Sequence, residues 1–206
     1  MPTVSFVNII KPKLKTVNAE SPFGIFHDIL AESLSEWFNI ILPLQNGTAT
    51  GTIITPVGAS FPFTYPLMKA NILKIYFNSV LIKGCAIGTG EDFFPNLFNY
   101  IGLTITQQLG SWTSSPPSMG APNPIYLTGI ATPLPITTHF YNIGLAYKYL
   151  LKVKQPTDSD LFDYTWSQFE QKLKFAINTI PLLWMPVAGV TPAGTFTGFC
   201  TVKFTV

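Results

Sequence analysis

The 206-residue sequence predicts an α+β fold made of three units, each an amphipathic helix followed by a strand rich in glycine and threonine. Three observations predict this class. Apolar residues recur at helical spacing in three separate segments. Each segment is followed by a proline-containing break and then by strand-forming residues. Two further apolar segments, expected to be helices, separate the units, and we expect one domain over residues 21–206.

Residues 1–20 are expected to form an N-terminal arm. They contain the strand-like run VSFVNII, followed by lysines spaced around Pro12. Terminal segments stay mobile unless other elements hold them, so this segment is suited to docking. It lacks the basic-then-apolar order of a secretory signal peptide.

The first unit, residues 21–83, begins with Ser21 and Pro22, which suit the N-cap and first position of a helix. An apolar stripe follows: Phe26, Ile29, Leu30, Leu34, Trp37, Phe38 and Ile41. Pro43 ends the helix, and NGTATGTIITPVG then predicts a turn and a strand. Residues 66–83 are apolar on nearly all sides, and their length favours a buried helix over a pair of strands.

The second and third units, residues 84–154 and 155–206, follow the same plan. The second has a helical stripe: Phe94, Leu97, Phe98, Ile101, Ile105, Leu109 and Trp112. After the SSPPSMGAPNP loop, IYLTGIATP predicts a strand and 140–153 the second intervening helix. In the third unit, PTDSD starts a helix with a further stripe: Trp166, Phe169, Leu173, Ala176, Ile177, Ile180 and Trp184. The strand-like ending is GVTPAGTFTGFCTVKFTV.

These units suggest an internal repeat of about 70 residues, a period that favours duplication of a small unit over a solenoid. Phe26, Phe98 and Phe169 are spaced 72 and 71 residues apart. Each is followed by a tryptophan and later by a Thr-Gly step. The tryptophans are Trp37, Trp112 and Trp184, and the steps are Thr50-Gly51, Thr128-Gly129 and Thr197-Gly198.

Charged residues are scarce and unevenly placed. They make up 11% of the chain, against roughly 25% in typical domains, and are absent from 37–68, 93–147 and 175–202. Such long uncharged stretches are hard to place on an open surface, so we expect burial against other subunits. A membrane-associated or pore-forming protein is the alternative, although prolines interrupt every apolar run before the ~20 residues of a spanning helix. The candidate interface residues are Trp37, Thr50, Gly51, Trp112, Thr128, Gly129, Trp184, Thr197, Gly198 and Phe199.

The sequence predicts neither an enzyme nor a reader of nucleic-acid sequence. All twelve basic residues are lysines, so the planar arginine fork that suits phosphate and guanine is missing, and the net charge is only +2. Adjacent helical residues such as His27 and Asp28 point in different directions and cannot form a relay. His139 can be combined on paper with Ser111, Ser114 or Ser115 and an aspartate, but no GxSxG turn holds the serine.

No cofactor or metal is expected either. Cys85 and Cys200 lack metal-site spacing and predict buried free thiols. The acidic pairs at 91–92 and 158–160 each precede an expected helix, where negative charge offsets the helix dipole. That position explains them without calcium or catalysis.

The helix FGIFHDILAESLSEWFNIIL and the ending AGVTPAGTFTGFCTVKF together resemble small structural proteins of tailed bacteriophage particles, such as tail, baseplate, neck or capsid-associated components. The resemblance covers the three helix–strand units. It implies a non-enzymatic virion component, assembled in the host cytoplasm, whose Gly/Thr strands add to neighbouring sheets. Its expected partners are other copies of itself and other structural proteins, and the resemblance supplies no catalytic residues.

Overall fold

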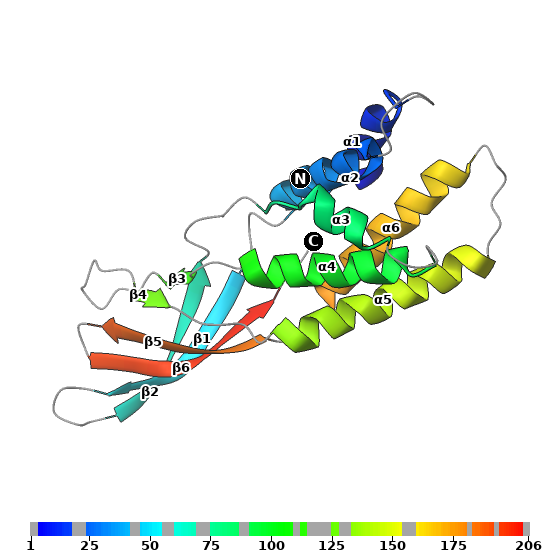
Figure 1. Ribbon diagram of the computed structural model, residues 1–206. Coiled ribbons are helices and arrows are strands. Elements are labelled where there is room, and N and C mark those ends of the chain that lie inside the picture. The colour runs from blue at the N-terminus through cyan, green and yellow to red at the C-terminus, as the bar shows by residue number, and fades with distance from the viewer. Residues whose placement is uncertain are drawn as a thin grey trace.

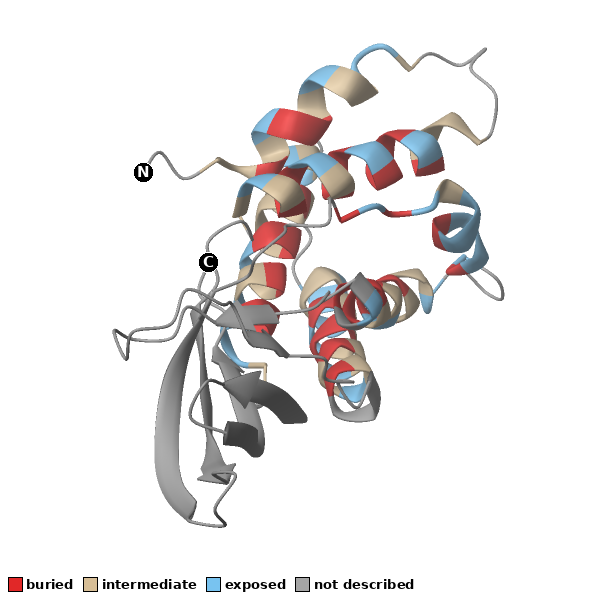
Figure 2. Cartoon of the chain, turned by 90° about the vertical axis from the view of Figure 1, so that its left-hand side faces the viewer, coloured by how far each residue is buried: buried red, intermediate tan, exposed pale blue. Residues whose placement is uncertain are grey.

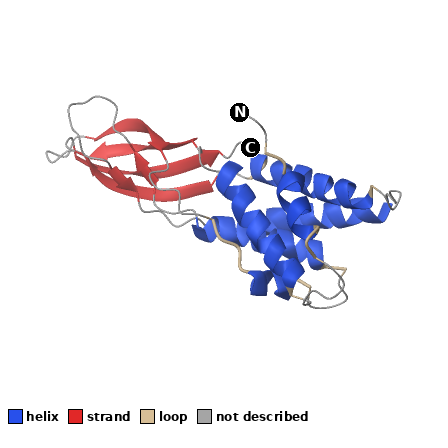
Figure 3. Cartoon of the chain, turned by 90° about the horizontal axis from the view of Figure 1, so that it is seen from above, coloured by secondary structure: helices blue, strands red, loops and turns tan. Residues whose placement is uncertain are grey.

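The computed structural model describes residues 4–17, 24–41, 46–54, 60–68, 75–86, 91–108, 112–114, 125–127, 133–153, 160–180, 183–191 and 194–203. Helices and strands form two distinct parts placed side by side (Figures 1 and 3). The helices are α1 (Phe6–Leu14), α2 (Ile25–Ile41), α3 (Ser79–Gly84), α4 (Phe93–Gln108), α5 (Pro133–Val153) and α6 (Leu161–Asn178). The strands are β1 (Asn46–Ile54), β2 (Ser60–Met68), β3 (Trp112–Ser114), β4 (Ile125–Leu127), β5 (Leu183–Thr191) and β6 (Gly194–Lys203).

The helical part has a single core, to which the apolar stripes of the long helices turn (Figure 2). Phe169 of α6 lies at its centre and is fully buried. The centroid of its ring lies 5.4–6.3 Å from those of five other aromatic rings: Phe6, Phe94, Phe98, Tyr147 and Trp166. Aromatic pairs in this range add stabilisation beyond the area they bury. This one ring therefore connects α1, α4, α5 and α6.

Helix α1 is fixed to α6 by a carboxylate. Glu170 Oε2 accepts hydrogen bonds from the backbone N–H of Phe6 at 2.8 Å and from Ser5 Oγ at 2.7 Å. It thus satisfies a free donor at the positive end of the α1 dipole. The strand expected in this segment is wrong, because residues 6–14 form a helix whose Phe6 and Ile10 belong to the core.

Helices α4 and α5 pack closely because each has a glycine at the contact. A Cβ atom built on Gly144 would lie 2.8 Å from the Pro95 Cα, and one on Gly102 would lie 3.0 Å from the Phe140 ring. Lys148 Nζ also donates to Asp92 Oδ1 at 2.8 Å, which ties α5 to the start of α4. The backbones of α4 and α5 therefore lie close together where their apolar stripes pack.

The strands form one antiparallel sheet in the order β4-β3-β2-β1-β6-β5. The first and last Gly/Thr runs, β1 and β6, are neighbours at its centre, and Gly51 pairs with Gly198. Because both strands are hydrogen-bonded on both sides, the expectation that they offer free edges to other subunits is wrong. The terminal strands β4 and β5 approach each other, with Cα atoms within 8 Å, so the sheet curls.

The predicted fold class is wrong. Of the residues whose side-chain burial is described, 83% lie in six helices and none in a strand. The core of the helical part is formed by helices packed against one another. It does not consist of three helix–strand units separated by apolar helices. The helices bury their stripes against one another, and the strands pair with strands from distant parts of the chain, so no helix needs a strand of its own.

The buried helix expected over residues 66–83 is also wrong. Strand β2 runs to Met68, and only Ser79–Gly84 is helical within the described part of this segment, with the Asn78 side chain accepting from the Val80 N–H at its start. Val80 and Leu81 are exposed. The segment is apolar on all sides, so no periodicity marked where the strand ends and the helix begins.

We expect Phe169→Ala to lower the free energy of unfolding by about 3–5 kcal/mol, because it empties the centre of the helical core. Phe175→Ala is the matched control on the same helix. Phe175 is 56% exposed, so its loss is expected to stay below about 1 kcal/mol. Urea unfolding followed by circular dichroism measures both, and equal losses would contradict a core centred on Phe169.

We expect Gly144→Ala to destabilise the chain by about 1–3 kcal/mol, even though alanine favours helix, because its Cβ atom overlaps the α4 backbone. Gly84→Ala is the control, since a Cβ atom there meets no atom within 4 Å. The same unfolding measurement compares them. A Gly144→Ala variant as stable as Gly84→Ala would show that α4 and α5 are farther apart than described.

Candidate interface: the uncharged sheet

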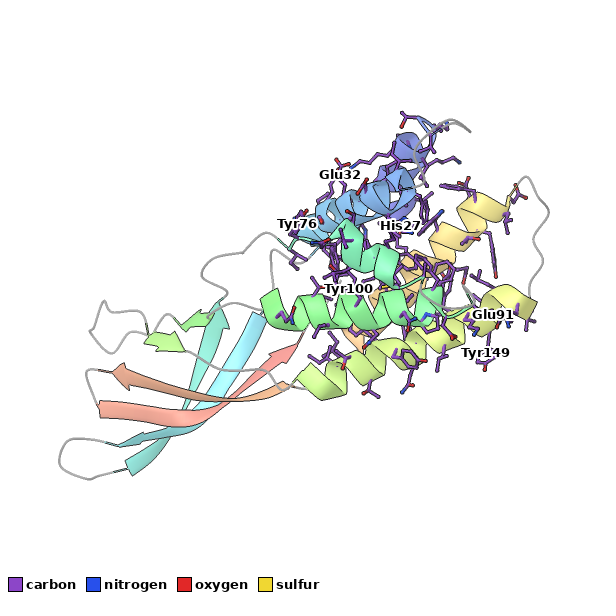
Figure 4. All side chains as sticks on the ribbon, viewed as in Figure 1. His27, Glu32, Tyr76, Glu91, Tyr100 and Tyr149 are labelled. Atoms are coloured by element: carbon purple, nitrogen blue, oxygen red, sulfur yellow. The ribbon has the colours of Figure 1, made fainter. Side chains whose placement is uncertain are left out.

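Charge is separated between the two parts of the molecule. Lys203, at the end of β6, is the only charged residue in the six strands. The described ion pairs join helices or adjoining turns, among them Lys11–Asp163, Lys13–Glu36 and Lys148–Asp92. Figure 4 shows the labelled acids Glu32 and Glu91 on the helical part, away from the sheet. The strands therefore lie in the uncharged blocks of the sequence, as do α4 and most of α5.

The strand register gives the sheet two different faces, because alternate residues of a strand share a face and directly paired residues lie on the same side. One face, called here the hydroxyl face, carries Thr48, Thr50, Thr52, Thr195, Thr197, Phe199, Thr201 and Trp184. The same register also places on it Asn46, Ile54, Pro62, Pro66, Met68, Pro186, Ala188, Val190 and Lys203. The other, called the apolar face, carries Ala49, Ile53, Phe61, Phe63, Leu67, Trp112, Met185, Phe196 and Val202.

The glycines of the strands share one face of the sheet. By the strand register, all five lie on the apolar face: Gly47, Gly51, Gly189, Gly194 and Gly198. Glycines within strands mark positions where a sheet bends sharply. Among the described elements, strands pack mainly against strands and helices mainly against helices.

The predicted interface residues are distributed over several places. Four of them share the hydroxyl face: Thr50, Trp184, Thr197 and Phe199, with Thr50 paired to Phe199. The apolar face carries three more: Gly51, Trp112 and Gly198. Thr128 and Gly129 lie outside the described residues.

Trp37 is separate from the sheet. It lies in α2, is fully buried, and donates its indole N–H to the Val4 carbonyl at 3.1 Å. The folded chain leaves it no surface to offer to another subunit. Its equivalence to Trp112 and Trp184 was inferred from spacing, but those two residues lie in strands β3 and β5.

Sequence reasoning missed the other threonines of the hydroxyl face, Thr48, Thr52, Thr195 and Thr201. The signal was present in the alternation of threonine with small residues in NGTATGT and in GTFTGFCT. A strand with this period presents every second residue on one face. A Thr-Gly step consists of neighbouring residues, so its two members, such as Thr50 and Gly51, lie on opposite faces.

Several titratable groups of the helical part make structural contacts. A ring nitrogen of His139 lies 3.1 Å from both the Ala176 carbonyl and Thr179 Oγ1, which joins α5 to α6. Glu91 and Asp92 precede α4 as expected and pair with Lys152 and Lys148. Within the described segments, no three His, Cys, Asp or Glu residues come together in a way that could hold a metal ion.

Two hollows are described on the helical part, and both are small. One of about 370 Å³ is lined by residues that include Asp28, Glu32 and Tyr76, and one of about 300 Å³ lies over the Lys11–Asp163 pair. Ligand pockets span about 300–1,000 Å³, so both are at the low end. Their linings combine apolar surface with exposed charged side chains, which is ordinary for grooves between helices.

No known protein family, curated protein or solved structure matches this chain. None of the described helices combines the length and the apolar character needed to cross a lipid bilayer.

We expect Cys85 to be unreactive in the folded protein. Burial raises the pKa of its thiol to about 11, so at pH 8 only about one molecule in a thousand carries the reactive thiolate. In a Cys200→Ser variant, Cys85 is the sole thiol. A disulfide-exchange reagent should react slowly with this variant in buffer and fully in denaturant. Rapid reaction in buffer would show that Cys85 is accessible.

Proposed function

We propose that this protein is a structural subunit of a large protein assembly, such as a virus particle, and that it contacts its neighbours through the uncharged sheet. The observation that supports the proposal is the charge separation. Only Lys203 is charged in the strands, while the described ion pairs lie on the helices. The core of a protein interface is depleted of charged residues, as this sheet is.

The two parts suit different tasks. A helical body with exposed lysines and carboxylates keeps a subunit soluble, because charged surfaces resist non-specific association. An uncharged sheet gains by contact with a similar surface. In this proposal the partners are other copies of the chain and other structural proteins of the same assembly.

The virion is the assembly that we favour. The support is the resemblance of the α2 helix and the Gly/Thr ending to small structural proteins of tailed bacteriophages. Such a subunit would join the particle in the host cytoplasm and act through contacts, with no catalytic step.

We expect the purified protein to associate as its concentration rises, and the association to change little between low and high sodium chloride. Contacts without ion pairs are insensitive to screening, whereas excluded salts such as sulfate should strengthen them. Sedimentation velocity over a concentration series measures this.

Two outcomes would contradict the proposal. A monomer at every concentration and salt would remove the assembly role. Association abolished by sodium chloride would place the contact on the charged helices and not on the sheet.

A further inference from the structure

We infer that residues 75–86, called here the strap, stay bound to α2 and α4 at neutral pH and are released when His27 is protonated. The strap consists of residues 75–78, the short helix α3 and the two residues that follow it. The inference concerns the helical part alone. It goes beyond the proposed assembly role and does not depend on it.

The strap is held along one row of α2 residues, spaced four apart, which form a ridge on a helix surface. Asn39 makes two hydrogen bonds with the backbone of Ile75, at 2.8 and 3.0 Å. Four residues earlier, Ser35 Oγ accepts from the Phe77 N–H at 2.9 Å. The Phe77 ring also packs on Phe38 of α2, with centroids 5.3 Å apart. Side chains of α2 therefore take the place that a neighbouring strand would have beside residues 75–77.

The same row leads to His27 at its other end. Ala31, the next position, lines one hollow together with Ser79 of α3. His27 follows four residues earlier and is only 8% exposed. Its pKa is affected by the charge of Lys83, near the end of α3. The strap thus runs antiparallel to α2 and brings α3 to the position of His27.

Two polar side chains of α4 hold the other side of the strap. The Asn78 N–H donates to the Tyr100 hydroxyl at 2.8 Å, and Asn96 Nδ2 donates to the Cys85 carbonyl at 3.3 Å. Figure 4 shows the labelled Tyr100 on α4, below α3. The backbone of the strap is therefore attached at both ends by single side-chain hydrogen bonds, each of which contributes only about 0.5–1.5 kcal/mol.

The strap is small enough to be released without unfolding the rest. Helix α3 has six residues, far fewer than the roughly 12–15 that an isolated helix needs. Ile75, Phe77 and Ile82 are buried, but Val80 and Leu81 are exposed. Segments with few buried apolar side chains open at a lower free energy than the core does.

Protonation of His27 is unfavourable while the strap is in place. Burial holds the pKa of His27 below its ordinary value of 6.5, and the positive charge of Lys83 lowers it further, while Asp28 acts in the opposite direction. The other charged residues of α2 and of the adjacent α1 segment are Lys11, Lys13, Lys15, Glu32 and Glu36. Of these, Lys13 forms ion pairs with both glutamates.

Release of the strap removes these effects. His27 then meets water and loses the nearby charge of Lys83, so its pKa returns toward 6.5. The released form therefore binds a proton more tightly than the bound form does, and a falling pH shifts the equilibrium toward release. Attachment is complete above about pH 6.5 and weakens as the pH falls below it.

Cys85 reports the release, because its thiol is buried when the strap is bound. In a Cys200→Ser variant it is the sole thiol, and a dithiodipyridine reagent, which reacts with thiols even in acid, measures its accessibility. Protection is the reaction rate in denaturant divided by the rate in buffer at the same pH. We expect protection to fall about tenfold between about pH 7.5 and 5, within the roughly thirtyfold limit for a group whose pKa returns to 6.5.

His27→Gln in the same background should abolish this fall, because its side chain takes up no proton. His139→Gln is the matched control at the other histidine of the chain, which joins α5 to α6, and should keep the fall. Helical circular dichroism should change little, since α3 contains six residues. Constant protection in the parent protein, an equal fall in His27→Gln, or loss of helix together with protection would each overturn the inference.

Hydrogen exchange of the wild type keeps the test valid if His27→Gln does not fold. After correction for the intrinsic effect of pH on exchange, amides of residues 79–84 should lose protection between about pH 7.5 and 5, while those of 161–178 keep theirs. Equal changes in both segments, or no change in residues 79–84, would overturn the strap and leave the assembly role standing. Sedimentation at neutral pH tests that role separately.

Discussion

The ring of Phe169 is the contact on which the helical part depends, because it connects α6 to aromatic rings on α1, α4 and α5. Glu170, the next residue, fixes the start of α1 through the backbone N–H of Phe6. Two adjacent residues therefore bring the first helix and the last into one core. The consequence extends to the sheet. Once the helices have buried their stripes against each other, none of those described remains to cover the strands.

The strands pair with strands from distant parts of the chain, and the two outermost strands, β4 and β5, approach each other. The strand glycines are confined to one face by the register, and Gly51 beside Gly198 places two of them together between β1 and β6. The two faces of the sheet therefore differ in composition.

The spacing of apolar residues in the sequence predicted where the main helices lie, but it did not predict how the strands pair in the sheet. The three predicted stripes coincide with α2, α4 and α6 over residues 25–41, 93–108 and 161–178. The last predicted positions of the second and third stripes, Trp112 and Trp184, lie in strands instead. The pairing of Thr50 with Phe199 joins strands about 150 residues apart, and no local pattern encodes which distant strand is the partner. Trp37 shows the same limit, because spacing placed it in an interface while the fold buries it.

The absence of charge marked two different kinds of segment. The blocks free of charge include the strands, except for Lys203, and also α4 and most of α5, whose apolar side chains lie in the helical core. The predicted grouping of these blocks into three units was wrong. A face rich in hydroxyl groups differs from a purely apolar one in how it would select partners. Threonine rows are satisfied only when donors and acceptors meet in register, and a misplaced partner leaves them unpaired. In the assembly role that we propose, such a surface would trade some affinity for a fixed geometry between subunits.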